Sequence, residues 1–211
     1  SDLRRQRQMC IRDSKYTFLM KLLLVIIISA FAMSILGQRG KDGDLSIGSS
    51  TIVNEYTYLT ADASAGQNSI SVNNSGLNQN TRFSANLSAG DLIFIYQAQG
   101  ASLATTSSTS GWGAVTGYNN CGNYEFCEVS SVPNGNTIMI NCSLKNSYTA
   151  SGNVQIVRVP RYNTLTVNNE ITCDPWNGQI GGLVIIESLG DITINSGGSI
   201  DLSLIHISEP T

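Results

Sequence analysis

Residues 124–142 read YEFCEVSSVPNGNTIMINC, and this stretch decides the fold class that we expect for the chain. Two runs in which apolar and polar residues alternate lie on either side of Asn134-Gly135. Alternation with a period of two is typical of a β-strand with one buried face. Asn-Gly favours a two-residue hairpin turn, because both central positions of that turn need a positive φ. The stretch therefore predicts an antiparallel β-hairpin.

The turn also sets the register that we expect for this hairpin, because successive side chains alternate between the two faces of a strand. Two cysteines then lie opposite each other on the apolar face, in a hydrogen-bonded pair. That is not the easiest geometry for a disulfide, so a bulge or pairing with other cysteines stays open. The expected partners are Val132 with Thr137, Ser131 with Ile138, Val129 with Ile140, and Cys127 with Cys142.

Strand patterns continue on both sides of the hairpin. No stretch after residue 37 keeps the 3.6-residue apolar period of a helix, and turn-forming segments such as AGQN, LSAG and ASGN separate the apolar runs. We therefore expect an all-β fold, with a sandwich-like antiparallel domain over residues 44–160. The other strands expected are 51–59, 69–72, 91–97, 153–159 and 164–173.

The segment 161–201 has a shorter period. Apolar runs at 183–187, 191–195 and 199–202 recur about every eight residues, and glycines separate them. This pattern predicts either a meander or the first coils of a β-solenoid. We expect the segment to begin a second sheet or a β-solenoid, which needs several coils to bury its core.

The N-terminal region predicts export. Met20-Lys21 precedes LLLVIIISAFAMSILG at 22–37, which gives a basic start, an apolar run and small residues. A secretory signal peptide is therefore expected over residues 20–37, with an uncleaved anchor as the alternative. The apolar run has sixteen residues, fewer than the roughly 20 that span a bilayer, so membrane contact is expected only before cleavage.

The two ends of the chain, 1–14 and 202–211, resemble translated sequencing adapter. Back-translation of QMCIRDS at 8–14 and of LSLIHISEPT at 202–211 gives the adapter of transposase-based libraries in opposite orientations. We therefore expect both ends to be artefacts and residues 15–201 to be the natural part. The only histidine, His206, and Cys10 lie in these ends.

Charge and composition limit the possible functions. Residues 38–201 contain six Lys or Arg and twelve Asp or Glu, a net charge of −6. Nucleic-acid binding is disfavoured, because no basic cluster is present to neutralise phosphates. Without His206, no histidine is available to activate a serine or cysteine nucleophile. We expect no catalytic residue, no cofactor, and a secreted or cell-surface location.

Four cysteines lie within residues 38–201, and an even number in an exported chain favours disulfides. Four cysteines allow three connectivities, and buried free thiols are the alternative. Neither the CxxC spacing nor the histidines of a zinc site occur here. The disulfide candidates are Cys121, Cys127, Cys142 and Cys173.

Aromatic residues supply the candidate ligand contacts. Segment 101–120 is rich in Ser, Thr and Gly and is expected to be a long exposed loop, where binding residues often lie. Trp112 and Tyr118 in this loop are possible glycan contacts, because an exposed aromatic ring has an apolar face on which a sugar ring can stack. Trp176 is instead expected to fill the join between the sandwich and the later strands.

The charged residues are mostly expected to have structural roles. Glu125 is expected to hydrogen-bond inside the domain, and Arg158 to form a salt link at the surface. Calcium is a weak possibility, since extracellular modules bind it through oxygen ligands. Two sets of residues are candidates, and a solvated linker is the alternative interpretation of the first set. The two candidate ligand sets are Asp42 with Asp44, and Asp174 with Asn177 and Asp191.

An ordered set of motifs runs through residues 56–201. It consists of GDLIFIYQAQG at 90–100, GNYEF at 122–126, VRVPRY at 157–162, PWNG at 175–178 and GG at 181–182. The set resembles the N-terminal β-rich module of large secreted adhesin-like and gliding-motility surface proteins of type IX-secreting and gliding bacteria. The resemblance implies a β-rich stalk at the cell surface.

These observations favour a non-enzymatic, exported cell-surface or adhesin-like structural or binding module. Its expected partners are surface glycans or other cell-surface proteins. One alternative is a carbohydrate-binding module of a secreted polysaccharide-degrading enzyme. Another is a polysaccharide-degrading β-helix enzyme of which only the N-terminal edge is present.

Overall fold

A computed structural model describes residues 39–106 and 110–202, which belong to a compact unit that begins at Gln38. The expected signal peptide, the 1–14 end, Cys10 and His206 lie outside the described residues, as does the 202–211 end except Leu202. In the part that is described, no helix has the length and apolar character to cross a membrane.

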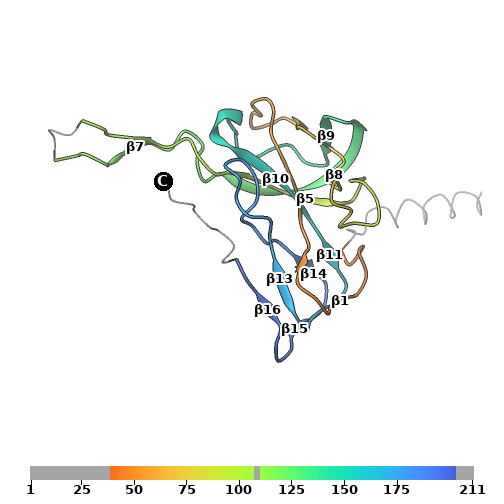
Figure 1. Ribbon diagram of the computed structural model, residues 1–211. Helices are drawn as coiled ribbons and strands as arrows, with labels where there is room; N and C mark the ends of the chain where they lie inside the picture. Colours follow the sequence, from red (N-terminus) through yellow and green to blue (C-terminus); the bar gives the residue numbers. More distant parts are fainter. Residues whose placement is uncertain (1–38, 107–109, 203–211) are drawn as a thin grey trace, which may run out of the picture. The chain divides into compact units, whose positions relative to one another are not determined.

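The fold is all-β, as the alternating patterns predict. The only helical element of the described residues is one 3₁₀ turn, Ala150–Gly152. A six-stranded sheet, antiparallel at every pairing, forms the larger part (Figure 1). In spatial order its strands are β3 (Glu55–Tyr58), β10 (Val154–Val159), β5 (Leu92–Gln97), β8 (Tyr124–Asn134), β9 (Thr137–Ile140) and β4 (Ser69–Ser71).

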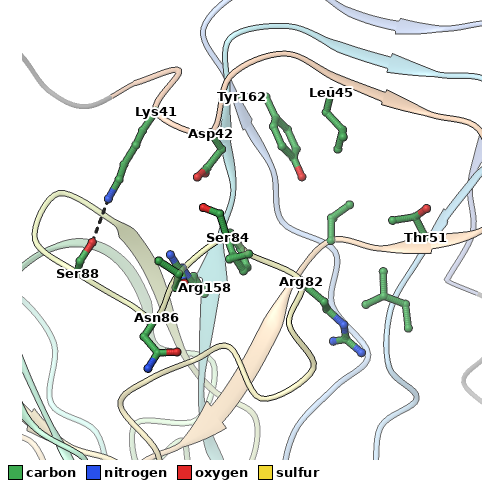
Figure 2. Close-up of a pocket in the computed structure, with 14 residues that line it drawn as sticks. Lys41, Asp42, Leu45, Thr51, Arg82, Ser84, Asn86, Ser88, Arg158 and Tyr162 are labelled. Atoms are coloured by element: carbon green, nitrogen blue, oxygen red, sulfur yellow. Dashed lines mark hydrogen bonds between the residues drawn. The ribbon is translucent and has the colours of Figure 1, made fainter.

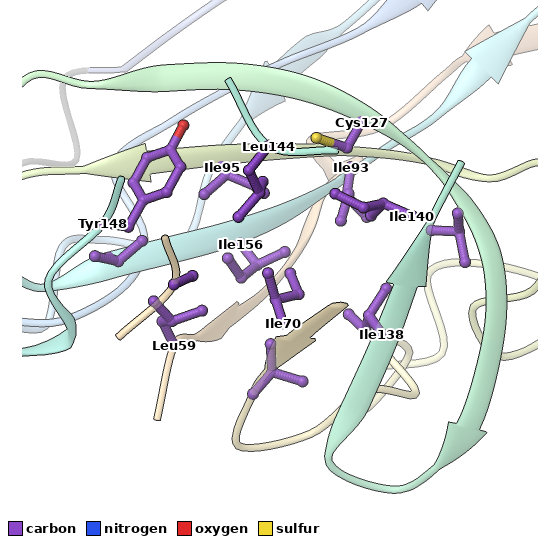
Figure 3. Close-up of a cluster of buried hydrophobic side chains, with 14 of the residues drawn as sticks. Leu59, Ile70, Ile93, Ile95, Cys127, Ile138, Ile140, Leu144, Tyr148 and Ile156 are labelled. Carbon is purple, nitrogen blue, oxygen red and sulfur yellow. The ribbon is translucent and has the colours of Figure 1, made fainter. Parts of the chain in front are cut away.

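The sheet curls around its own hydrophobic core. In strand β5, LIFIYQ, every second side chain is buried, so Ile93 and Ile95 point to the inside of the curve. Figure 3 shows Ile70, Ile138 and Ile156 meeting them from other strands. Burying one such side chain contributes about 1.5–3 kcal/mol.

Eight further strands form parallel sheets at the other end of the unit. Strand β1 (Leu45–Ile47) pairs with β12 (Leu165–Val167), which pairs with β15 (Ile192–Ile194). A second parallel sheet contains β2 (Thr51–Ile52), β13 (Glu170–Thr172) and β16 (Ser199–Ile200), and a third pairs β11 (Arg161–Tyr162) with β14 (Glu187–Ser188). These strands stack as three coils, so the solenoid interpretation is confirmed and the meander is wrong. We call residues 45–52 coil 1, 161–172 coil 2 and 187–200 coil 3.

The six-stranded sheet is therefore inserted between coil 1 and coil 2. The expected sandwich boundary of 44–160 included residues 45–52, but these pair with residues 165–172. The expected strand 51–59 is likewise divided, because β2 and β3 belong to different sheets. Buried Asn54 lies at the division, where its side chain bonds the backbone of Arg158 and Ile185. Alternation identifies strands but not their partners.

The β8–β9 hairpin forms where it was predicted, but its turn is shifted by one residue. The turn lies at Gly135-Asn136, with Asn134 opposite Thr137, and the side chain of Asn134 accepts a bond from the Asn136 amide. The predicted pairs of Val132 with Thr137 and Ser131 with Ile138 are wrong. Two bulges restore the pairing of Val129 with Ile140, as predicted. Pro133 has no N–H to donate, which favours a bulge there.

Candidate binding surface

The predicted 101–120 loop contains a two-stranded hairpin that extends the β5–β8 pair. Its strands are β6 (Ser102–Leu103) and β7 (Val115–Gly117), and Figure 1 shows the hairpin projecting from the six-stranded sheet. Trp112 and Tyr118 are both exposed, with 65% and 71% of their surfaces accessible. The two predicted glycan contacts thus lie on one projection and face solvent.

The base of this hairpin is held by a buried glutamine. The side chain of Gln97 donates to the carbonyl oxygens of Gln99 and Asn119, at 2.9 and 3.0 Å, and accepts a bond from the Thr149 amide at 2.8 Å. Gly100 has φ +126°, and a Cβ there would lie 3.0 Å from the Gln97 amide nitrogen. The projection therefore starts from a fixed base, which limits the entropy that ligand binding must remove.

A second set of aromatic residues, which sequence reasoning missed, lies on the outer face of the six-stranded sheet. Phe94 lies opposite Phe126, and Tyr96 opposite Tyr124. The ring centroid of Phe94 is 6.3 Å from that of Tyr96, 5.8 Å from Tyr124 and 4.8 Å from Phe126. Tyr124 and Phe126 are exposed. We call these four residues the aromatic strip; the alternation of IFIYQ with YEF was the signal that could have revealed it.

A shallow cavity of about 290 Å³ adjoins the aromatic strip at Tyr96. Trp176 and Leu183 line its other side, together with Gln99 and Gln155. Trp176 is half-buried and lies where the segment after coil 2 passes the sheet, which is the position expected for it. Aromatic rings and amide side chains thus lie together at this end of the strip.

A larger cavity, about 400 Å³, lies between coil 1 and residues 82–88 (Figure 2). Arg158 reaches it but is buried, and its guanidinium donates to Asp91 at 2.9 Å and stacks 3.9 Å from the centre of the Phe83 ring. The expected surface salt link of Arg158 is therefore wrong. Burial lowers the pKa of Arg158, while Asp91 opposes that effect.

The other cations at this cavity also have carboxylate partners. Lys41 contacts Asp91, and Arg82 makes two bonds to Asp174, at 2.7 and 2.8 Å. The Arg82–Asp174 pair ties residues 82–88 to the segment after coil 2, and Lys41 also donates to the Ser88 hydroxyl. Lys41 and Arg158 share Asp91, so all three cations at the cavity already have a carboxylate partner, and this arrangement favours a structural role.

No disulfide joins the described cysteines, which corrects the expectation of a bridge. Strand β9 ends at Ile140, so Cys142 leaves the apolar face and is exposed while Cys127 stays buried. Burial, with the nearby Glu125 carboxylate, raises the pKa of Cys127 to about 12. Burial also raises the pKa of Cys173, whereas half-buried Cys121 contacts the Ala98 carbonyl oxygen at 3.5 Å.

The acidic candidates are occupied by hydrogen bonds. Glu125 accepts bonds from the Lys145 and Asn146 amides and from the Tyr148 hydroxyl, so it has the internal role expected. Asp42 accepts the Arg161 amide, and the side chains of Asn163 and Thr164 bond Asp44 and lower its pKa. Among the described residues no three or more His, Cys, Asp or Glu side chains gather where they could hold a metal ion.

No protein-family model and no curated protein matches the chain. Among solved structures it is similar to the tailspike gp49 of Pseudomonas phage LKA1, at 24% identity and a TM-score of 0.33, over 64% of this chain and 23% of that one. It is also similar to the gp54 tailspike of Acinetobacter baumannii bacteriophage AP22, solved with A. baumannii capsular saccharide. The identity is 16% and the TM-score 0.34, over 72% of this chain and 27% of that one. For the gp61 tailspike of Pseudomonas phage phi297 the identity is 15% and the TM-score 0.33, over 75% of this chain and 23% of that one. The chain spans about a quarter of the length of these tailspikes.

Proposed function

We propose that this chain is a non-enzymatic module of an exported cell-surface or adhesin-like protein, and that it binds glycans. The supporting observation is the exposure of aromatic side chains along one continuous β5–β8 extension. Trp112 and Tyr118 lie on the projecting hairpin, and Tyr124 and Phe126 lie on the sheet below it. The motif resemblance to secreted surface proteins of gliding bacteria supports the same location.

Binding would occur by stacking of these rings on the apolar faces of sugar rings. A ring that loses about 60 Å² of apolar surface to a ligand contributes about 1.5 kcal/mol. Aromatic side chains have few rotatable bonds, so little conformational entropy opposes the contact. Several rings in a row would let one polysaccharide chain make several such contacts.

Glu125 and Glu128, the two glutamates that lie closest together in the sequence, support a non-enzymatic role. Glu125 is bonded by three donors of the 145–148 segment. Glu128 accepts bonds from the side chains of Arg161 and Asn141. Both carboxylates are thus used to hold neighbouring segments, and a glycosidase instead needs a pair of carboxylates that faces its substrate.

A glycan-binding measurement tests the proposal. We would titrate the chain with a panel of soluble capsular and cell-wall polysaccharides by calorimetry, and repeat it with Trp112→Ala combined with Tyr118→Ala. We expect saturable binding that weakens at least tenfold, which corresponds to about 1.4 kcal/mol. Leu189→Ala, at an exposed apolar residue within coil 3, is the matched control and should leave affinity unchanged. Absence of saturable binding, or equal loss with both variants, would contradict the proposal.

A carbohydrate-binding module of a polysaccharide-degrading enzyme is the second candidate. The cavity between Tyr96 and Trp176 favours it, because amide side chains lie there beside the aromatic rings. The adhesin-like module and the enzyme's binding module can be distinguished by testing whether the complete protein cleaves polysaccharide. Release of new reducing ends from a bound polysaccharide by the complete gene product would support the enzyme module, and unchanged polysaccharide would support the adhesin-like protein.

A further inference from the structure

Equivalent side chains in coils 2 and 3 differ sharply in exposure. In coil 2, Leu165, Val167 and Ile171 are fully buried, each at 0%. Their register partners in coil 3 are Ile192, Ile194 and Ile200, which are 47%, 51% and 46% exposed. In-register parallel strands stack equivalent side chains in columns, so the partners belong to the same apolar columns. The coil 3 members are exposed because no further strand of the described residues stacks on them.

The other end of the stack is covered by the chain itself. In coil 1, Ile47 is the register partner of Val167 and is only 2% exposed. Residues 82–88 of the inserted sheet region face coil 1 and line the 400 Å³ cavity with it (Figure 2). The coils therefore have one covered end and one open end.

The backbone of coil 3 is open as well. Strands β14, β15 and β16 are each the last strand of their sheet, so their outer N–H and C=O groups face no further strand in the described residues. Natural edge strands usually carry charged residues or proline that prevent further pairing. Residues 192–200, ITINSGGSI, contain neither, and the charged residues of coil 3 are Asp191 and Glu187, of which Glu187 pairs with Arg39 and Arg161. This edge therefore has the character of a surface on which another strand pairs.

We propose that a fourth parallel β-coil, formed by continuation of the same polypeptide, stacks on β14, β15 and β16. It carries aliphatic side chains in register with Ile192, Ile194 and Ile200. Coil 2 pairs in parallel with coil 1 on one side and with coil 3 on the other. The proposed coil would pair with coil 3 in the same parallel arrangement. A second copy that docked through its coil 1 fits less well, because residues 82–88 face that coil, although β1 and β2 are also outer strands of their sheets. This inference does not depend on glycan binding.

Hydrogen exchange tests the proposal on the full chain and on a chain lengthened by one coil. The added coil repeats residues 187–200, so its isoleucines lie in register with those of coil 3. We expect the outward amides of residues 192–194 and 199–200 to exchange at least tenfold more slowly in the longer chain. Ile194→Lys in that chain should abolish the slowing. Thr193→Lys, on the other face of β15, should preserve it.

Three results would overturn the proposal. The coil 3 amides could already be as protected in the unextended chain as those of β12. The added coil could leave their exchange unchanged although circular dichroism shows an intact fold. Sedimentation of the unextended chain at micromolar concentration could reveal a dimer that Ile194→Lys dissociates, in which case a second copy covers the surface.

Discussion

The six-stranded sheet and the coil stack bury their apolar residues in different ways. The sheet curls, so side chains from β4, β5, β8, β9 and β10 meet in one core around Ile95, Ile138 and Ile156. The coils are flat layers with a small core around Leu165, Val167 and Ile171, and each layer depends on the next one for cover. Coil 3 lacks that cover on its outer side. An antiparallel sheet can thus complete its own core, whereas a parallel stack needs a cap at each end.

The largest expected effect separates the two regions directly. Ile156→Ala removes buried methyl groups from the sheet core and should lower the free energy of unfolding by about 4 kcal/mol. Ile194→Ala makes the same chemical change on the open coil and should lower it by less than about 1 kcal/mol. Urea denaturation of both variants measures the difference. Equal losses would mean that coil 3 is covered in solution.

The next effect concerns the connection between the regions. Arg158→Met leaves buried Asp91 with Lys41 as its only cationic partner and removes the donor to the Ala85 carbonyl oxygen, so it should cost about 3 kcal/mol. Arg82→Met is the control, since its partner Asp174 is partly exposed, and it should cost less than half as much. Thermal unfolding followed by circular dichroism compares them. A larger loss with Arg82→Met would show that residues 82–88 are held mainly through Asp174.

A smaller effect is expected within the coils. Val167→Ala opens a cavity in the middle layer of the stack and should cost about 2 kcal/mol. Its effect should be local, so hydrogen exchange should accelerate at residues 165–172 more than at 93–97. Uniform acceleration would instead indicate that the sheet and the coils unfold as one cooperative unit.

The thiols give a pH-dependent comparison. With a pKa of about 12, Cys127 holds about 1000-fold less thiolate at pH 8 than a thiol with the ordinary pKa of 9.0. It should therefore react far more slowly with a disulfide reagent than exposed Cys142. Unfolded chains release this proton near pH 9, whereas the fold retains it. Stability should therefore fall as pH rises from about 9 to about 12. Equal labelling rates for the two thiols would contradict the burial of Cys127.

The smallest effect is expected at the projection. Trp112→Ala should change the free energy of unfolding by no more than about 0.5 kcal/mol, because the ring packs against little of the fold. Thermal unfolding checks this. A larger loss would give Trp112 a structural role and would weaken its assignment as a ligand contact.

The candidate surface was only half predictable from the sequence. Trp112 and Tyr118 lie in a Ser/Thr/Gly-rich segment, where burial is least expected, and the structure exposes both. The aromatic strip needs the pairing of β5 with β8, which places Phe94 beside Phe126 although 32 residues separate them. The disulfide expectation failed for a related reason: where β9 ends determines which way Cys142 points.

The sequence by itself determined the strand content, the face of most strands and the existence of the β8–β9 hairpin, because these follow from alternation and turn residues close together in the chain. Only the tertiary structure decided that residues 45–52 pair with residues 165–172 rather than with the sheet that follows them, and that Arg158 is buried. Alternation specifies which side of a strand is apolar. It does not specify the partner, which depends on the closure of long loops and on the surface that remains uncovered once the local hairpins have formed.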